Sequence, residues 1–201
     1  MSDSQPPMPS RPQRPLYLLV ALFAAWALGL GGIMVGCVTI SVCRDPGAIL
    51  SEATRMETDG ALEGFVEALD LRRGSMIPLA AANTVLSSLL VVACSRALAS
   101  KRNARSLALQ AVIANIMYAI VGYFVSAPVR EAYVASTVAM SVPGQSQPVD
   151  TTQLAATIDW NIRLMAAIRV AVLCFVAYSL TRPRVIAFFQ PPEESGQSEE
   201  A

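Results

Sequence analysis

Arg169 lies close to the middle of an apolar segment, residues 162–180, that is long enough to cross a bilayer. A charged side chain at that depth costs about 2.5–3.5 kcal/mol on the insertion scale, so it needs a partner. None of the other long apolar segments contains an acidic residue that could pair with it. Because a positive charge in an apolar setting attracts anions, Arg169 is the strongest candidate for chemistry in this chain.

Neutral polar residues on two other apolar segments are candidate partners for Arg169. Counted from the ends of their segments, Asn115 and Ser87 fall at about the depth of Arg169, and Asn83 precedes Ser87 by one helical turn. We expect these four side chains to form a polar layer inside the membrane.

Three interpretations of Arg169 remain open from the sequence. In the first, Arg169 hydrogen-bonds to Asn115 and to backbone carbonyl groups, or reaches toward the membrane surface, and serves only the structure. In the second, it pairs with an acidic residue of another subunit. In the third, it binds an anion or a lipid headgroup within the bundle.

Residues that enzymes commonly use are scarce. The chain has no histidine, which is the commonest general base and metal ligand. Cys37 and Cys43 are six positions apart, on different faces of a helix, while Cys94 and Cys174 are single residues in separate segments. The sequence contains no H-E-x-x-H motif, intramembrane Asp pair or phosphate-binding glycine loop. We therefore expect no enzymatic activity, metal or cofactor, and we expect the cysteines to be small apolar packing residues.

A second pattern lies in the stretch GLGGIMVGC, residues 29–37. Ala25, Gly29, Gly32 and Gly36 recur at spacings of four, three and four, which places them along one side of a helix. Small residues at this spacing let helix backbones approach closely in lipid. We expect this small-residue stripe to pack on the second or fourth apolar segment, or on the first segment of another copy. The alternative is that glycine and alanine are simply common in membrane helices.

Residues 34–37 also resemble a loose lipoprotein cleavage box, with Cys37 as the acylated residue. Secretory signals have an apolar core of about 7–15 residues. Here the apolar run begins at Leu16 and continues past Cys37 to Val42. Its length favours a first segment that is retained in the membrane.

Composition places the chain in a membrane. Hydrophobic residues make up 54% of its 201 residues and charged residues 15%, with a mean hydropathy of +0.48. Soluble domains average about 25% charged residues, so this chain has too few charges to cover a water-facing surface. The net charge is zero, which gives no reason to expect nucleic acid as a partner. The expected partner is the lipid bilayer, with other membrane proteins or a second copy as further candidates, and no small-molecule ligand is predicted.

These observations predict an all-α protein, an integral membrane four-helix bundle with four transmembrane helices and short outer helices. The predicted spans are residues 16–42, 77–97, 107–127 and 162–180. They are joined by outer segments 43–76 and 128–161 and by a cytoplasmic loop at 98–106, within a membrane domain of residues 16–182. The polar composition of residues 1–15 and the acidic, Pro-rich composition of 183–201 predict two disordered cytoplasmic tails.

Basic residues predict the orientation. The connector 95–106 carries four basic residues and no acidic one, while Arg11 and Arg14 precede the first span and Arg182 and Arg184 follow the fourth. Basic residues in short loops remain in the cytoplasm, so both termini are expected there. All but one of the 15 basic residues are arginine. This bias favours a GC-rich bacterial genome, and hence the bacterial inner membrane.

The outer segments contain helix signals. In the first, Asp59 is expected to cap a helix over residues 60–73 that ends at Gly74, after a shorter helix at 46–57. The apolar face of the helix at 60–73 is expected to pack on the bundle.

In the second outer segment, Asp150 and Gln153 form a capping-box pattern before a helix that continues unbroken over residues 151–182. That helix would be about 48 Å long, which exceeds the thickness of the hydrocarbon core. Asp159 and Arg163, at positions i and i+4, are expected to pair.

Two functions from different classes fit this sequence. The first is a non-enzymatic membrane subunit or scaffold, whose small-residue stripe and outer helices engage other membrane proteins. The second is a small transporter or channel component in which Arg169 faces an anion or a headgroup. A structural arginine should accept replacement by glutamine with a modest loss of folding, whereas a transport site should lose activity while the fold persists.

Overall fold

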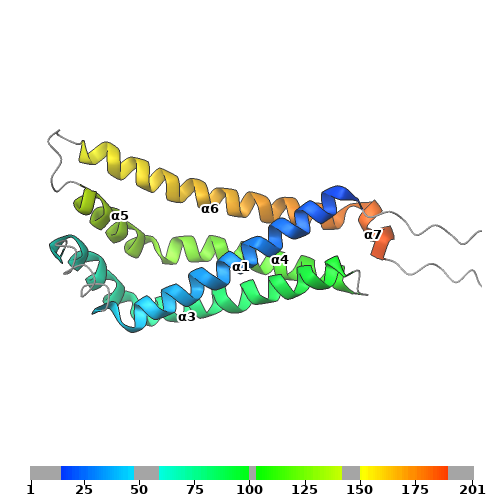
Figure 1. The fold of residues 1–201 in the computed structure, drawn as a ribbon, viewed down its shortest axis with the longest axis horizontal. Helices are drawn as coiled ribbons and strands as arrows, with labels where there is room; N and C mark the ends of the chain where they lie inside the picture. Colours follow the sequence, from blue (N-terminus) through cyan, green and yellow to red (C-terminus); the bar gives the residue numbers. More distant parts are fainter. Residues whose placement is uncertain (1–14, 48–58, 100–102, 142–149, 190–201) are drawn as a thin grey trace, which may run out of the picture.

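The structure is a computed structural model that describes residues 15–47, 59–99, 103–141 and 150–189. Within these ranges it contains six helices and no strand (Figure 1). The helices are α1 (Leu16–Arg44), α3 (Asp59–Leu98), α4 (Ala104–Val125), α5 (Ala127–Ser141), α6 (Thr151–Thr181) and α7 (Pro183–Phe189). The prediction of an all-helical chain is confirmed for this part of it.

Four of the helices, α1, α3, α4 and α6, are long and apolar enough to cross a membrane. Helices α1, α3 and α6 include the predicted spans 16–42, 77–97 and 162–180, and α4 covers the third predicted span, 107–127, only as far as Val125. Large apolar side chains such as Phe23, Met34 and Phe124 are exposed along them, as is expected where lipid replaces water. These features are compatible with a multi-pass membrane protein.

The main apolar core lies at the end of the bundle where α1 and α4 begin and where α3 and α6 end (Figure 1). We call this the basic end, because the connector 95–106 and the residues after α6 carry its arginines. Leu22, Leu90 and Leu173, from three different helices, are almost fully buried there. Their burial ties α1, α3 and α6 to one another by apolar contact.

A smaller core lies at the opposite end, which we call the cap end. It is formed by Cys43 of α1, Leu69 and Met76 of α3, and Val129 of α5. The rings of Phe65 and Tyr133 add an edge-to-face contact, with centroids 5.7 Å apart. The first turns of α3 therefore pack on α1 and α5 of the same chain, as their apolar face predicted.

One boundary prediction is wrong, because the helix at 60–73 does not end at Gly74. Instead α3 continues without a break from Asp59 to Leu98, about 60 Å, and passes through both Gly74 and Pro78. A glycine inside a helix costs only about 1 kcal/mol. Leu69 and Met76, on either side of Gly74, are both buried in the cap-end core, and this packing holds both parts of the helix against the same neighbours.

Two further helices were not predicted from the sequence. Helix α5 begins at Ala127, directly after α4 ends at Val125, and Pro128 occupies its first turn, where proline is well tolerated. Helix α7 lies at the start of the segment predicted to be a disordered tail, and its Val185 is buried in the main core. The predicted helix at 46–57 and the remaining parts of both tails fall largely outside the described residues.

The signals for α6 are confirmed. The Asp150 carboxylate accepts hydrogen bonds from the backbone N–H groups of Thr152, at 3.0 Å, and Gln153, at 3.3 Å. The helix has 31 residues, about 46 Å, so it extends beyond a hydrocarbon core of about 30 Å. Asp159 and Arg163 form the expected ion pair at 2.6 Å.

Candidate functional site

The small-residue stripe of α1 lies directly on α3. Ala25, Gly29, Gly32 and Gly36 are buried. A Cβ atom added at Gly29 would lie 2.7 Å from Cγ2 of Val91, closer than real Cβ atoms approach another atom. Of the three neighbours expected for this stripe, it meets the second apolar segment of its own chain.

The same close approach continues along α1. A Cβ atom at Gly32 would overlap the Ser87 side chain, and one at Gly36 would overlap the Thr84 hydroxyl and lie 3.0 Å from the Ala80 carbonyl oxygen. The α1 backbone thus rests on the side chains and carbonyl groups of α3 over two helical turns. Glycine is required at these positions because of space.

Three of the four residues of the predicted polar layer meet at this contact. Asn83 donates a hydrogen bond from Nδ2 to the Gly32 carbonyl oxygen at 2.8 Å. Its Oδ1 accepts one from Nη2 of Arg169 at 3.3 Å and a weaker one from the Ser87 hydroxyl at 3.4 Å. Asn83 therefore links the stripe on α1 to the arginine on α6.

Asn115, the fourth residue, lies apart from this group. Its side-chain amide donates to the carbonyl oxygens of Leu86, at 3.0 Å, and Ala111, at 2.9 Å, so it joins α4 to α3. Its Oδ1 is buried and accepts no hydrogen bond from any described residue. Arg169 does not bond to Asn115, as the first interpretation expected, because its hydrogen bond goes to Asn83 instead.

A cavity of about 500 Å³ adjoins Arg169 in the cap-end half of the bundle. We call it the Arg169 cavity. Side chains of α1, α3, α4 and α6 line it, and most of them are apolar. Its polar side chains are Thr39, Asn83, Tyr118, Tyr123, Ser126 and Arg169. No acidic side chain from the described part of the chain lines the cavity, and Arg169 is the charged group among these lining residues.

Tyr118 is a cavity residue that was not part of the predicted polar layer. Its hydroxyl donates to the Leu79 carbonyl oxygen at 3.0 Å, which joins α4 to α3 at the cavity wall. A Cβ atom added at Gly122 would lie 3.6 Å from the Tyr118 ring, which is ordinary van der Waals contact, so the position of the ring does not require glycine there.

Arg130 of α5 is a second residue that the sequence did not single out. Its guanidinium stacks over the Tyr123 ring at 4.1 Å from the centroid and donates to the Tyr123 carbonyl oxygen at 3.0 Å. It also lies 3.9 Å from the Asp159 carboxylate, which Arg163 shares. This cluster joins α5 to α4 and α6 beyond the cavity. It could not be predicted from the sequence because helix α5, which carries Arg130, was not predicted.

The cysteines and the metal-binding residue types form no centre in the described ranges. Cys43 and Cys94 are buried and Cys37 and Cys174 are exposed, all four without a disulfide. Cys37 lies inside α1, seven positions before the helix ends at Arg44. No group of three or more His, Cys, Asp or Glu side chains that could hold a metal is found among the residues described.

Comparisons of the chain with protein-family models, with curated proteins and with solved structures found no match. The functional argument for this helical chain, with its four candidate membrane spans, therefore comes from the contacts around Arg169.

Proposed function

We propose that this chain is a multi-pass membrane protein that binds an anionic group in the Arg169 cavity, as a component of a small transporter or channel. The observation that supports this most directly is a guanidinium group at the wall of a partly open cavity of about 500 Å³ that is lined by four helices. Asn83 accepts one hydrogen bond from that group, and none of the described residues that line the cavity is acidic.

The charge balance of the cavity favours an anion. Arginine stays protonated in proteins and has five N–H donors. The Asn83 carboxamide is neutral, so it satisfies one donor of Arg169 but leaves the positive charge without a counter-charge. A guanidinium binds a carboxylate, phosphate or sulfate through two parallel hydrogen bonds. A free oxyanion and a lipid headgroup present this same chemistry.

The position of the cavity predicts which side of the membrane it lies on. The cavity lies in the half of the bundle next to the cap end, and the positive-inside rule assigns that half to the outer side of a bacterial inner membrane. Both termini then lie in the cytoplasm. Reporter fusions after residues 60 and 101 test this orientation, since the first should report from outside and the second from the cytoplasm.

The scaffold hypothesis stays a prediction with less support. It relied in part on the small-residue stripe, and Gly29, Gly32 and Gly36 contact α3 of their own chain. A scaffold would have to use other surfaces, such as the exposed apolar faces, which lipid also covers. The Arg169 cavity therefore supports the transporter or channel hypothesis better.

The experiment compares two arginines of α6. Purified protein is reconstituted into phosphatidylcholine vesicles, and uptake of phosphate and of sulfate is measured for the unaltered chain, Arg169→Gln and Arg163→Gln. Both variants remove one positive charge, but Arg163 lies outside the Arg169 cavity. We expect Arg169→Gln to lower uptake about 10- to 100-fold, as loss of charged hydrogen bonds implies. Arg163→Gln should leave uptake unchanged.

A second variant and a lipid measurement complete the test. Ala166→Asp puts a carboxylate at the cavity wall one turn before Arg169, so it should occupy the guanidinium and block anion uptake while the fold is kept. Mass spectrometry of co-purified lipid identifies the headgroup source if Arg169→Gln removes bound phospholipid instead. Unchanged uptake and unchanged bound lipid in both Arg169→Gln and Ala166→Asp would contradict the proposal.

A further inference from the structure

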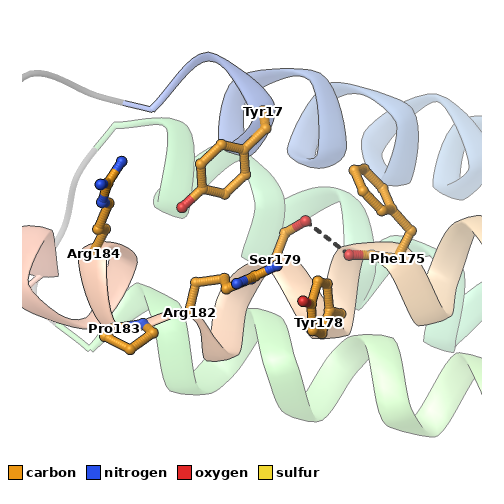
Figure 2. Close-up of a pocket in the computed structure, with 7 residues that line it drawn as sticks. All are labelled: Tyr17, Phe175, Tyr178, Ser179, Arg182, Pro183 and Arg184. Carbon is orange, nitrogen blue, oxygen red and sulfur yellow. Dashed lines mark hydrogen bonds between the residues drawn. The ribbon is translucent and has the colours of Figure 1, made fainter.

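A second pocket lies at the basic end, at the opposite end of the bundle from the Arg169 cavity. It has a volume of about 470 Å³ and lies where α1 begins and α6 gives way to α7 (Figure 2). Its walls are Tyr17, Phe175, Tyr178 and Pro183, and its charged residues are Arg182 and Arg184. Among the residues that the structure describes, no acidic side chain lines it. We call this the basic-end pocket.

The basic-end pocket has a cationic part and an apolar part. Arg182 and Arg184 follow the last turn of α6, while Phe175 and Tyr178 lie on α6 itself and are about half exposed. In Figure 2, Tyr17 of α1 lies across the pocket from Arg182, and Phe175 lies farther along α6. The pocket is therefore amphipathic along the helix axis.

The arginine positions in this pocket are supported by neighbouring groups. The Arg182 guanidinium lies over the Tyr178 ring at 4.3 Å from the centroid, a cation–π contact that leaves its edge donors for a ligand. Arg105 of α4 donates to the Leu180 carbonyl oxygen at 2.8 Å and adds a further positive charge at this end. These contacts bring three arginines to the end of α6.

The hydroxyl groups of Ser179 and Tyr17 differ in whether their protons are available to a ligand. The Ser179 hydroxyl donates to the Phe175 carbonyl oxygen at 2.8 Å, as the dashed line in Figure 2 shows, so its proton is already used. The Tyr17 hydroxyl makes no hydrogen bond to any residue that the structure describes. It can donate to a ligand that sits between Tyr17 and Arg182.

We infer that the basic-end pocket binds one anionic phospholipid, with its phosphate at Arg182, Arg184 and the Tyr17 hydroxyl and an acyl chain along Phe175 and Tyr178. A free oxyanion would leave the apolar wall without a partner. A neutral lipid would leave the arginines without a counter-charge. Basic pockets between membrane helices at the cytoplasmic side recognise acidic headgroups for this reason.

The depth of the pocket agrees with a headgroup. Tyr17 is the second residue of α1, and Arg182 directly follows the last residue of α6. Both therefore lie at the end of a membrane-spanning segment, where headgroups and interfacial tyrosines are found. On the predicted orientation this is the cytoplasmic leaflet. The inference does not depend on the function proposed for the Arg169 cavity.

Native mass spectrometry of the full chain in mild detergent tests the inference. Phosphatidylglycerol and phosphatidylcholine with the same acyl chains are titrated separately, and the bound fraction is measured. We expect tighter binding of phosphatidylglycerol. Arg182→Gln/Arg184→Gln should weaken it about 25-fold, because each basic residue near an acidic headgroup contributes about fivefold in affinity. Tyr17→Phe, which removes only the hydroxyl, should weaken it by a smaller factor.

The matched control is Arg72→Gln/Arg96→Gln, which removes the same charge from two exposed positions outside the pocket. This control should bind phosphatidylglycerol as the unaltered chain does. Equal binding of the two lipids, or an equal loss in the control and in the Arg182→Gln/Arg184→Gln variant, would overturn the inference. If the double variant does not fold, Tyr17→Phe decides, since unchanged phosphatidylglycerol binding by that variant contradicts the assigned phosphate position.

Discussion

Helix α3 makes two contacts of opposite character at the same depth. Toward α1 it meets glycine, and the backbones lie so close that a Cβ atom at Gly32 would overlap Ser87. Toward α6 it meets Arg169, whose long side chain reaches Asn83 across the wall of a cavity. The α1–α3 contact excludes any ligand, whereas the α3–α6 contact leaves room for one.

The difference between these two contacts shows how a small helical bundle can hold the charged side chain of Arg169. The close contact fixes α1 and α3 to each other, and the Gly32 carbonyl orients the Asn83 amide. Because its Nδ2 donates to the Gly32 carbonyl oxygen, Asn83 presents Oδ1 toward Arg169. The close α1–α3 contact therefore orients the amide that accepts the hydrogen bond from Arg169 on α6.

The largest expected effect comes from adding a side chain at the close contact between α1 and α3. Gly32→Leu should lower the free energy of unfolding by about 3 kcal/mol, because its side chain would collide with Ser87 and separate the helices. The matched control is Gly31→Leu, since a Cβ atom at Gly31 would meet nothing within 4 Å. Thermal unfolding of both variants in mild detergent measures the difference. Similar losses in the two would show that the contact is not governed by space.

An intermediate effect is expected from Asn83→Ala, which removes the link between the two contacts. The variant should lose about 1–2 kcal/mol of stability, and anion uptake should fall because Arg169 loses the partner that positions it. Asn115→Ala is the comparison, since Asn115 donates two hydrogen bonds to backbone carbonyl oxygens and makes none to Arg169. It should reduce stability and leave uptake intact. Equal effects of the two variants on uptake would remove Asn83 from the site.

The smallest effect is expected at the cap end, where two arginines share Asp159. The Arg163 side chain is 59% exposed and that of Arg130 only 14%. Arg163→Gln should leave the melting temperature within experimental error, because exposed ion pairs contribute little. Arg130→Gln should lower it measurably, since Arg130 also contacts Tyr123. A larger change at Arg163 than at Arg130 would reverse this ranking.

The features that the sequence predicted well depend on local pattern. Four helices of sufficient length follow from apolar runs, and the start of α6 follows from Asp150. The pairing of Asp159 with Arg163 requires only helical spacing. The position of Gly32 beside another helix follows from the absence of a side chain. Each of these needs information from a few neighbouring residues.

The features that it missed depend on how helices are rotated against one another. Asn115 and Asn83 lie at similar depths, but only Asn83 faces Arg169, because α4 turns Asn115 toward the Leu86 carbonyl oxygen. Residue counting gives depth and not rotation. Likewise, Gly74 has the sequence of a helix end, and only packing of Leu69 and Met76 on one core shows that α3 passes through it.

The hydrogen bond between Asn83 and Arg169 joins residues that are 86 positions apart, and this separation orders events during synthesis. At about 5–20 residues per second, the ribosome adds Arg169 roughly 4–17 s after Asn83. In the membrane arrangement proposed above, the α1–α3 hairpin would have time to insert and close before α6 leaves the ribosome. The costly arginine would then enter a bilayer that already contains its acceptor, so the order of translation itself should ease the insertion of the last span.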